Sequence, residues 1–324
     1  MSKRVARRAI VYFLTFTAPS LYGDDVTALR PARSADIDEI VDRVVRARRR
    51  HADGAEDSID VGALRREMND SLADISVLTN STGLVGHLRG TILEGGSFGR
   101  ALWMSPDGFS CNSAEDLLAL VEGCRPSWIE AGATAAYVWA PTIDATTWEE
   151  VGFQRVHARG VRVRGGDHPA DSFPEGYRAR RASLDDLDIA LSLDHAQTAS
   201  DPQTDGLPPG PVDEEWRETL EDPDSSYVIV EYHGIAVGHA VAFPLSAHTG
   251  SAQSRLHLSG VVILPEHRGR GVGRAMVRAV LDAAAAQDDT QVEVNWDTHN
   301  EVAQNFWRSL GFRETHLRLR RVLN

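Results

Sequence analysis

The sequence predicts a mixed α/β protein made of two successive halves, each with a largely antiparallel sheet covered by helices. Three observations lead to this fold class. The chain has 324 residues, which suits two domains of about 150 residues each. Strand-like runs alternate with amphipathic runs along the second half. Similar residues recur at a constant spacing between the two halves, as expected of an internal duplication.

The second half opens with a predicted strand over residues 177–182, and a helix follows it. Ser183 and Asp186 stand three residues apart, so that both side chains can cap backbone N–H groups of the first turn. Four prolines and two glycines exclude regular structure over residues 198–211. We therefore expect a loop there and a second short helix over 212–220.

Strands dominate the remainder of the second half. Two runs rich in β-branched and aromatic residues are separated only by His233 and Gly234, which favours a hairpin. A glycine-rich turn after Pro265 leads into a helix whose apolar residues form one stripe. The expected elements are strands over 226–232, 235–243, 256–264, 290–296 and 315–323, with helices after the turn and over 301–310.

The internal repeat is visible by counting positions. Three pairs lie 159 positions apart and two pairs near the start of each half lie 150 apart, a change that a difference in loop length explains. The pairs are Trp148 and Trp307, Phe153 and Phe312, Pro106 and Pro265, then Arg30 and Arg180, Asp36 and Asp186. We predict an N-terminal extension over 1–25, a first domain over 26–163, a linker over 164–175 and a second domain over 176–324.

Composition excludes several classes of protein. Hydrophobic residues make up 42% and charged residues 25%, which is typical of a folded soluble chain and not of a disordered or fibrous one. A net charge of -13 argues against a general nucleic-acid binder and mildly favours a cationic substrate. The two cysteines, Cys111 and Cys124, cannot form a disulfide framework or a cysteine zinc site. We expect a cytoplasmic protein without a metal.

The first 22 residues carry a basic start followed by an apolar stretch over 9–18, like the first two parts of a secretory signal. The stretch is shorter than the roughly 20 residues needed to span a bilayer, and it has no clear cleavage site. An extra strand, a helix on the surface or a start codon placed too early are the alternatives. We expect neither secretion nor a membrane partner.

The segment most informative about function runs from the predicted strand over 256–264, through the turn after Pro265, into the following helix. Arg268, Gly271 and Gly273 form the pattern Arg-x-x-Gly-x-Gly, while Arg270 and Arg274 add positive charge. Glycines allow a tight turn with inward N–H groups, and the helix adds its positive dipole end, so the loop can hold a pyrophosphate. The alternative is an ordinary tight turn. The spacing fits neither a dinucleotide fingerprint nor a Walker loop.

This loop resembles the acyl-CoA pyrophosphate loop of the GCN5-related N-acetyltransferase (GNAT) family. A second motif from Asn300 to Phe312 is similar to that family's Asn-x-x-Ala-x-x-Phe-Tyr-x-x-x-Gly-Phe segment. The resemblance is clear over 177–322 and fainter over 28–163. It implies two tandem GNAT-like acyl-CoA N-acyltransferase domains, a layout similar to that of mycothiol synthases, and acetyl-CoA as co-substrate.

The resemblance also implies a set of residues that bind acetyl-CoA. Backbone groups at the end of the strand would pair with the pantetheine arm, the glycine loop would hold the pyrophosphate, and an asparagine would contact the thiol end. These residues are Val261, Val262, Ile263, Arg268, Gly269, Arg270, Gly271, Val272, Gly273, Arg274 and Asn300.

The sequence offers several candidates for the catalytic groups. The position where the family often has a tyrosine that protonates the leaving thiolate holds Trp307, whose alternative role is core packing beside Phe306. Glu293 is our first candidate for the general base and His257 the second, with His239 as a further alternative. Each of the three could instead be a structural or solvent-facing polar residue.

The first half lacks the binding motif. At the spacing of 159, Gly271 falls on Asn112, Gly273 on Ala114, Arg268 on Phe109 and Asn300 on Pro141. No pyrophosphate cradle can form from these residues. We therefore expect a degenerate copy with a scaffolding role.

The predicted function is an acetyl-CoA-dependent N-acetyltransferase that acts on a primary amine of a small molecule by direct attack in a ternary complex. Acceptor contacts are expected from the 198–211 loop and the hairpin, where acidic residues either attract the amine or are merely solvated. These are Asp201, Asp205, Asp213 and Glu214. The alternatives are a noncatalytic acyl-CoA-binding protein, a mycothiol-synthase-like enzyme and a protein N-acetyltransferase.

Overall fold

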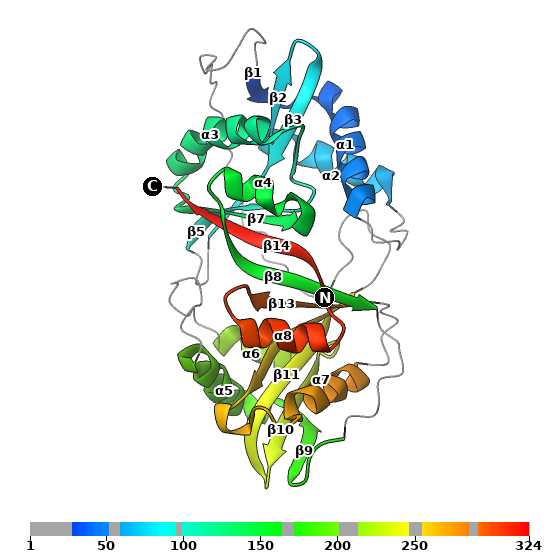
Figure 1. The fold of residues 1–324 in the computed structure, drawn as a ribbon, viewed down its shortest axis with the longest axis vertical. Coiled ribbons are helices and arrows are strands. Elements are labelled where there is room, and N and C mark those ends of the chain that lie inside the picture. The colour runs from blue at the N-terminus through cyan, green and yellow to red at the C-terminus, as the bar shows by residue number, and fades with distance from the viewer. Residues whose placement is uncertain are drawn as a thin grey trace. The chain divides into compact units, whose positions relative to one another are not determined.

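The computed structural model describes residues 28–51, 59–94, 99–163, 172–200, 213–245, 255–284 and 291–323 (Figure 1). The predicted N-terminal extension, most of the predicted linker and residues 201–211 of the predicted acceptor loop lie outside these ranges. Residues 198–200 of that predicted loop belong to a helix instead. Within them, no helix has the length and apolarity to cross a membrane. The mixed α/β fold class is confirmed.

The chain forms two compact units. Unit 1 comprises Met1–Val156 with His316–Asn324, and unit 2 comprises His157–Thr315. The two halves of the repeat do not coincide with these units, because each half gives its last strand to the other unit. We describe each unit by itself.

Unit 1 has two sheets, with strand orders β1-β2-β3-β6 and β4-β5-β7-β14. Its strands are β1 (Ala28–Pro31), β2 (Ile75–Asn80), β3 (Gly83–Arg89), β4 (Thr91–Glu94), β5 (Arg100–Met104), β6 (Phe109–Cys111), β7 (Ala135–Pro141) and β14 (Arg313–Val322). Its helices are α1 (Ile37–His51), α2 (Val61–Asp70), α3 (Ala114–Glu130) and α4 (Ala145–Glu150).

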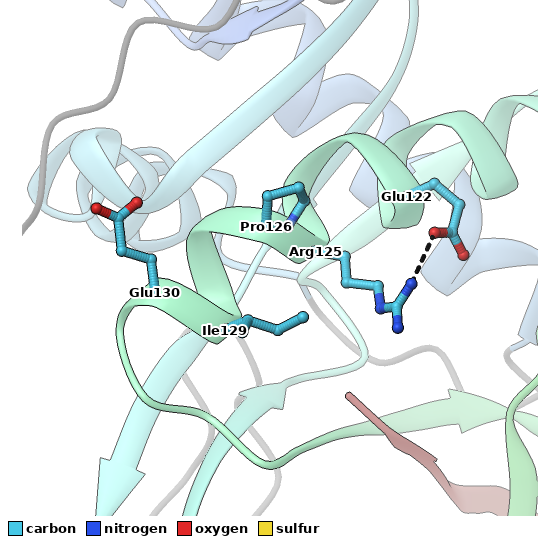
Figure 2. Close-up of a pocket in the computed structure, with 5 residues that line it drawn as sticks. All are labelled: Glu122, Arg125, Pro126, Ile129 and Glu130. Atoms are coloured by element: carbon cyan, nitrogen blue, oxygen red, sulfur yellow. Dashed lines mark ion pairs between the residues drawn. The ribbon is translucent and has the colours of Figure 1, made fainter. Parts of the chain in front are cut away.

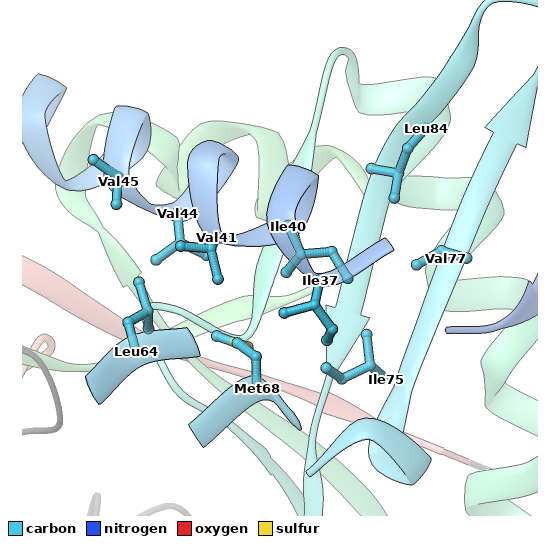
Figure 3. Packing of buried hydrophobic residues seen from close by; sticks show 10 residues of the cluster. All are labelled: Ile37, Ile40, Val41, Val44, Val45, Leu64, Met68, Ile75, Val77 and Leu84. Carbon is cyan, nitrogen blue, oxygen red and sulfur yellow. The ribbon is translucent and has the colours of Figure 1, made fainter. Parts of the chain in front are cut away.

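The core of unit 1 follows from the apolar stripe of α1. Ile37, Ile40, Val41 and Val44 recur at helical spacing and are buried against α2, β2 and β3 (Figure 3). Burial of such side chains stabilises a fold by about 1.5–3 kcal/mol each. Unit 1 therefore has a hydrophobic core of its own.

Unit 2 is one sheet in the order β8-β13-β12-β11-β10-β9. Its strands are β8 (Gln154–Val163), β9 (Tyr177–Arg181), β10 (Ser226–Tyr232), β11 (Ile235–Leu245), β12 (Arg255–Ile263) and β13 (Gln291–Asp297). Its helices are α5 (Leu187–Ser200), α6 (Asp213–Glu221), α7 (Val272–Ala283) and α8 (Glu301–Ser309). All pairings are antiparallel except that of β12 with β13.

The two faces of the unit 2 sheet carry different side chains. Tyr227, Ile229 and Val241 are buried on the face packed by α5 and α6. Because side chains alternate along a strand, the strand register places His239 and His257 on that same face. The opposite face packs against α7, whose predicted apolar stripe is buried.

The exchanged strands are long and regular. β8 pairs antiparallel with β13 from Gln291 opposite Val163 to Asp297 opposite His157. β14 pairs antiparallel with β7 from His316 opposite Pro141 to Val322 opposite Ala135 (Figure 1). The sheet of each unit is thus completed by the last strand of the other half of the repeat.

The duplication is visible in matching contacts. Arg30 holds Asp36 through two hydrogen bonds of 2.8 Å, and Arg180 holds Asp186 through two of 2.8 and 2.6 Å. Each pair ties the first strand of its half to the turn before the first helix. The two halves therefore share local structure as well as sequence spacing.

Candidate active site

The candidate site begins where two neighbouring strands of unit 2 separate. β12 and β13 pair from Arg255 opposite Gln291 only as far as Leu258 opposite Val294. Both strands continue, β12 to Ile263 and β13 to Asp297. The edge of β12 beyond Leu258 therefore offers backbone groups to an extended ligand that contains amides. The predicted residues Val261, Val262 and Ile263 lie on this edge.

A bulge in β12 stands at the same place. His239 is opposite Val262 and Val241 is opposite Ser259, so that Gly260 and Val261 together face one residue of β11. Gly260 has a φ of 53°, and a Cβ there would lie 2.5 Å from the Trp216 ring. The sequence analysis did not select Gly260 or Trp216. A glycine inside a strand pattern was the available signal.

Replacing Gly260 with alanine is expected to lower the free energy of unfolding by about 2–4 kcal/mol, because a strained φ and a steric clash add. Gly234→Ala is the matched control, since Gly234 has a φ of 86° but nothing within 4 Å of an added Cβ. Urea denaturation gives the free energy of unfolding of both variants. The difference between their losses reports the steric clash with Trp216, because both variants carry the strain of a positive φ. Equal losses would show that Trp216 does not restrict this position.

The glycine loop lies between the end of β12 and α7. Gly269 and Gly271 have φ values of 73° and 84°, and a Cβ at either would meet nothing within 4 Å. Gly271 is the N-cap of α7, whose first N–H groups have no partner within the helix. Open space beside these groups and the positive helix end suit a bound anion.

The other loop residues have different roles. A Cβ on Gly273 would make ordinary contacts of 3.5 Å with Phe306, and Gly273 has no positive φ. Val272 is buried, so that only its backbone is available to a ligand. Arg268 Nε donates to the Ile263 carbonyl at 2.7 Å, and Arg274 donates to Ser309 on α8 at 3.2 Å. Arg270 is exposed.

Asn300 is the N-cap of α8. Its Oδ1 accepts a hydrogen bond of 2.9 Å from the backbone N–H of Ala303. This cap fixes the side chain at the start of the helix. A contact from Asn300 to the thiol end of a ligand stays a prediction.

Glu293 and His257 lie opposite one another on β13 and β12, one position before the strands separate. Glu293 is buried, and its Oε1 lies 3.1 Å from Arg159 Nε and 3.5 Å from His257 Nδ1. Its Oε2 lies 3.6 Å from Arg255 Nη1. Arg159 comes from β8, the strand that the first half contributes, and no feature of the sequence pointed to it.

Opposing effects act on the pKa of Glu293. Burial raises the pKa, but His257, Arg159 and Arg255 together outweigh burial and lower it to about 2. A carboxylate held so firmly in its ionised form is a weak base. The arrangement therefore favours Glu293 as a partner that orients His257 over Glu293 as the group that takes a proton.

Acidification is expected to remove the stabilisation that Glu293 provides. Its pKa is about 2 in the folded protein, against about 4.3 when unfolded, so the contribution is complete above about pH 4.5 and is lost as the pH falls to about 2. The shift corresponds to roughly 3 kcal/mol. Glu293→Gln should show a flatter loss of stability than the wild type in urea denaturation between pH 4.5 and 2. Identical slopes would contradict the assignment.

Trp307 is buried in the structure. Its ring makes edge contacts with Phe306 and Phe312 at 4.9 and 5.2 Å between centroids. Trp148, its counterpart in the first half, makes the same contact with Phe153 at 4.8 Å. Since the half without a glycine loop repeats this packing, the structure supports the packing alternative for Trp307. The catalytic role stays a prediction.

The first half closes the corresponding helix start with its own side chains. Ser113 is the N-cap of α3, and its hydroxyl accepts from the Asp116 N–H at 3.1 Å. Asn112 Oδ1 accepts from Arg43 at 3.0 Å. A side chain thus satisfies one of the first N–H groups of α3, whereas Gly271 gives α7 no side-chain cap.

A hollow of about 420 Å³ lies along α3 in unit 1 (Figure 2). Its lining comes from that one helix and includes the ion pair of Arg125 with Glu122 at 3.5 Å. None of the predicted site residues lines it. We therefore place the candidate site at the separated strands of unit 2.

Comparisons with known proteins agree with this placement. Residues 192–312 match the sequence model of the acetyltransferase (GNAT) family. The N-alpha-acetyltransferase RimI of Mycobacterium tuberculosis is 35% identical over 101 residues, which cover 31% of this chain and 60% of the relative. N-acetyltransferase 8 of Rattus norvegicus is 31% identical over 96 residues, which cover 30% of this chain and 43% of the relative. The match thus spans less than half the length of the latter protein.

Two solved structures share the fold over most of the chain. A GCN5-related N-acetyltransferase from Sphaerobacter thermophilus has a TM-score of 0.60 at 15% identity, covering 92% of this chain and 96% of that protein. A tandem GNAT protein from the clavulanic acid biosynthesis pathway has a TM-score of 0.51 at 16% identity, covering 92% and 99%. At these identities the likeness concerns the fold alone. The acetyltransferase (GNAT) family model thus matches the stretch of unit 2 that holds the candidate site, and the two solved structures share the fold of most of the chain.

Proposed function

We propose that this protein is an acetyl-CoA-dependent N-acetyltransferase that acetylates a primary amine of a small molecule. The observation that carries the proposal is the separation of β12 from β13 directly beside a glycine loop at a helix start. The edge of β12 suits the amides of a pantetheine arm, and the loop suits a pyrophosphate. Both features lie in unit 2 and within one stretch of chain.

The proposed reaction is a direct transfer in a ternary complex. His257 takes a proton from the ammonium group of the acceptor, and Glu293 orients the imidazole. The amine nitrogen then attacks the thioester carbonyl carbon, and backbone N–H groups at the end of β12 stabilise the oxyanion. As the C–S bond breaks, the attacking nitrogen loses its second proton, which passes through solvent to the departing thiolate, so that the products are the amide and the free thiol of coenzyme A. No protein acid is assigned to this second transfer. Holding both reactants in place supplies most of the acceleration.

Thioester turnover tests this function. The protein is incubated with acetyl-CoA and a panel of small amines and N-terminal peptides, and thiol release is followed together with the mass of the acetylated product. Faster release with a small amine than with any peptide supports the proposal. Preferential acetylation of peptides would indicate a protein N-acetyltransferase, which is the activity in the printed name of the RimI relative.

A noncatalytic acyl-CoA-binding protein is the second candidate. The burial of Trp307 favours it, because the position that supplies an acid in many relatives is taken by a packing residue. Calorimetry with acetyl-CoA separates the two. Binding without thiol release from any amine would support the second candidate and contradict the first.

A further inference from the structure

His239 in β11 is a fully buried histidine that the reaction described above does not use. Its exposed fraction is 0%, and its Nδ1 forms a hydrogen bond with the hydroxyl of Tyr227 on the neighbouring strand β10. Its Nε2 is enclosed and has no hydrogen-bond partner in the described part of the chain. Such an orphaned polar atom costs about 1–3 kcal/mol and calls for an explanation.

The protonation states of the pair define what Nε2 offers. Burial lowers the pKa of His239 to about 4. Burial, followed by the negative charges of Asp194 and Asp186, raises the pKa of Tyr227. Both side chains are therefore neutral at pH 7. If the Tyr227 hydroxyl donates to Nδ1, the ring hydrogen resides on Nε2 and one donor is left over. If Nδ1–H instead donated to the hydroxyl oxygen, both Nε2 and the hydroxyl hydrogen of Tyr227 would lack a partner. Nε2–H is therefore the favoured tautomer.

The first half provides an internal comparison. His87 occupies the matching place in β3, after Val85 and Gly86 as His239 follows Val237 and Gly238. His87 is equally buried, but its Nδ1 lies 2.8 Å from the Ser110 hydroxyl and its Nε2 lies 3.4 Å from the Asp107 carbonyl. The half that lacks the glycine loop satisfies both nitrogens, whereas the half that has it leaves Nε2 open.

The position of His239 connects it with the candidate site. It stands opposite Val262 beside the β12 bulge, on the sheet face that also carries His257. The ring of Trp216 from α6 lies 5.1 Å from the imidazole and limits the space over Gly260. An acceptor that approaches the bulge from this face meets Trp216 and His239 together.

We propose that Nε2–H of His239 donates a hydrogen bond to an uncharged oxygen of the acceptor, so that the preferred substrate is an amine with a hydroxyl or carbonyl oxygen close to its amino group. The inference rests on the proposed function and deepens it. In this enclosed site the neutral donor favours an uncharged oxygen, because burying a carboxylate without a cationic partner would cost more free energy than one hydrogen bond returns. Because Nε2 is enclosed, the proposal requires Trp216 to move when the acceptor enters.

Matched amines test the proposal in the full-length protein. Ethanolamine is compared with propylamine, and glycinamide with isobutylamine, as acceptors for acetyl-CoA. The wild type is expected to give a kcat/KM at least about 10-fold higher for the oxygen-bearing member of each pair, because a site built to bond an oxygen disfavours its apolar analogue. The ratio within a pair is compared between variants, so the basicity of the amines cancels.

Two substitutions separate the two nitrogens of the ring. His239→Asn keeps a partner for Tyr227 but has no donor at the ε position, and it should lower the ratio at least about 10-fold relative to the wild type. His239→Gln keeps a donor at that position and should retain most of the preference. His87→Asn makes the same change in the first half and should leave the ratio unchanged.

Several outcomes would overturn the proposal. Equal ratios in the wild type and His239→Asn would do so, as would a His239→Gln variant that has lost the preference as fully as His239→Asn. NMR of ¹⁵N-histidine-labelled protein gives a readout that needs no turnover, and an Nδ1–H tautomer for His239 would also contradict it. Failure of the proposed function is distinct, since it would appear as absent acetyl-CoA binding or absent thiol release with every amine.

Discussion

Replacing Gly271 with valine is expected to lower the affinity for coenzyme A at least about 100-fold, or ~2.7 kcal/mol. Gly271 has a φ of 84°, and the space beside it is open in the structure. A branched side chain there both strains the turn and fills the place where an anion would meet the first N–H groups of α7. Isothermal titration calorimetry with coenzyme A measures the loss.

Two controls separate binding from general damage. Gly311 has a φ of 82° and the same open surroundings but follows α8, so Gly311→Val should cost similar stability, about 1–3 kcal/mol, and leave the affinity unchanged. Gly273→Ala adds only ordinary contacts to Phe306 and should be mild. Unaltered uptake by Gly271→Val would remove the basis for an acyl-CoA site.

Residues 172–324 expressed alone are expected not to fold. Without β8, the edge of β13 loses its neighbouring strand, and the Glu293 carboxylate loses one of its partners, Arg159 at 3.1 Å. Loss of one partner of a buried ion pair alone costs about 3–5 kcal/mol, and a missing strand adds unpaired backbone groups. Such losses are comparable with the whole stability of a domain, about 5–15 kcal/mol. Circular dichroism and urea titration of the fragment give the measurement.

A cut inside residues 164–171 provides the control. It leaves β8 on the first fragment and β14 on the second, so fragments 1–163 and 172–324 produced together should associate and give a cooperative unfolding transition. An isolated second fragment that unfolds as cooperatively as the intact protein would contradict the importance of the exchanged strands.

The sequence was informative wherever the cause of structure is local. The apolar stripe of α7, the turn glycines 269 and 271 and the Ser183 and Asp186 pairing depend on residues a few positions apart, and the structure has them. The strand boundaries of unit 2 fall within a few residues of those expected. The resemblance of the second half to the GNAT family rests on two motifs of this local kind, and the family model matches residues 192–312.

Pairings between segments far apart in the chain could not be predicted from the sequence. A run with strand pattern does not say which strand it pairs with, so nothing distinguished β8 in its own half from β8 beside β13. The sequence also did not show the full environment of Glu293, because Arg159 is distant along the chain and acts with His257 and Arg255 to lower the pKa of that carboxyl. Without these neighbours the sequence could only rank Glu293 first as a base by its residue type.

The exchange of β8 and β14 also bears on how a duplicated chain of this kind can arise. Consider a protein with a single copy of the repeat whose last strand leaves its own sheet. That sheet would lack a strand unless a second molecule supplied its own last strand in exchange. Two molecules that exchange strands in this way form a symmetric, domain-swapped homodimer. Fusion of two such genes would place both copies in one chain. The strand exchange would then be intramolecular, at an effective concentration in the mM range. From then on one copy can lose its ligand site while it still supplies the strand that its neighbour requires.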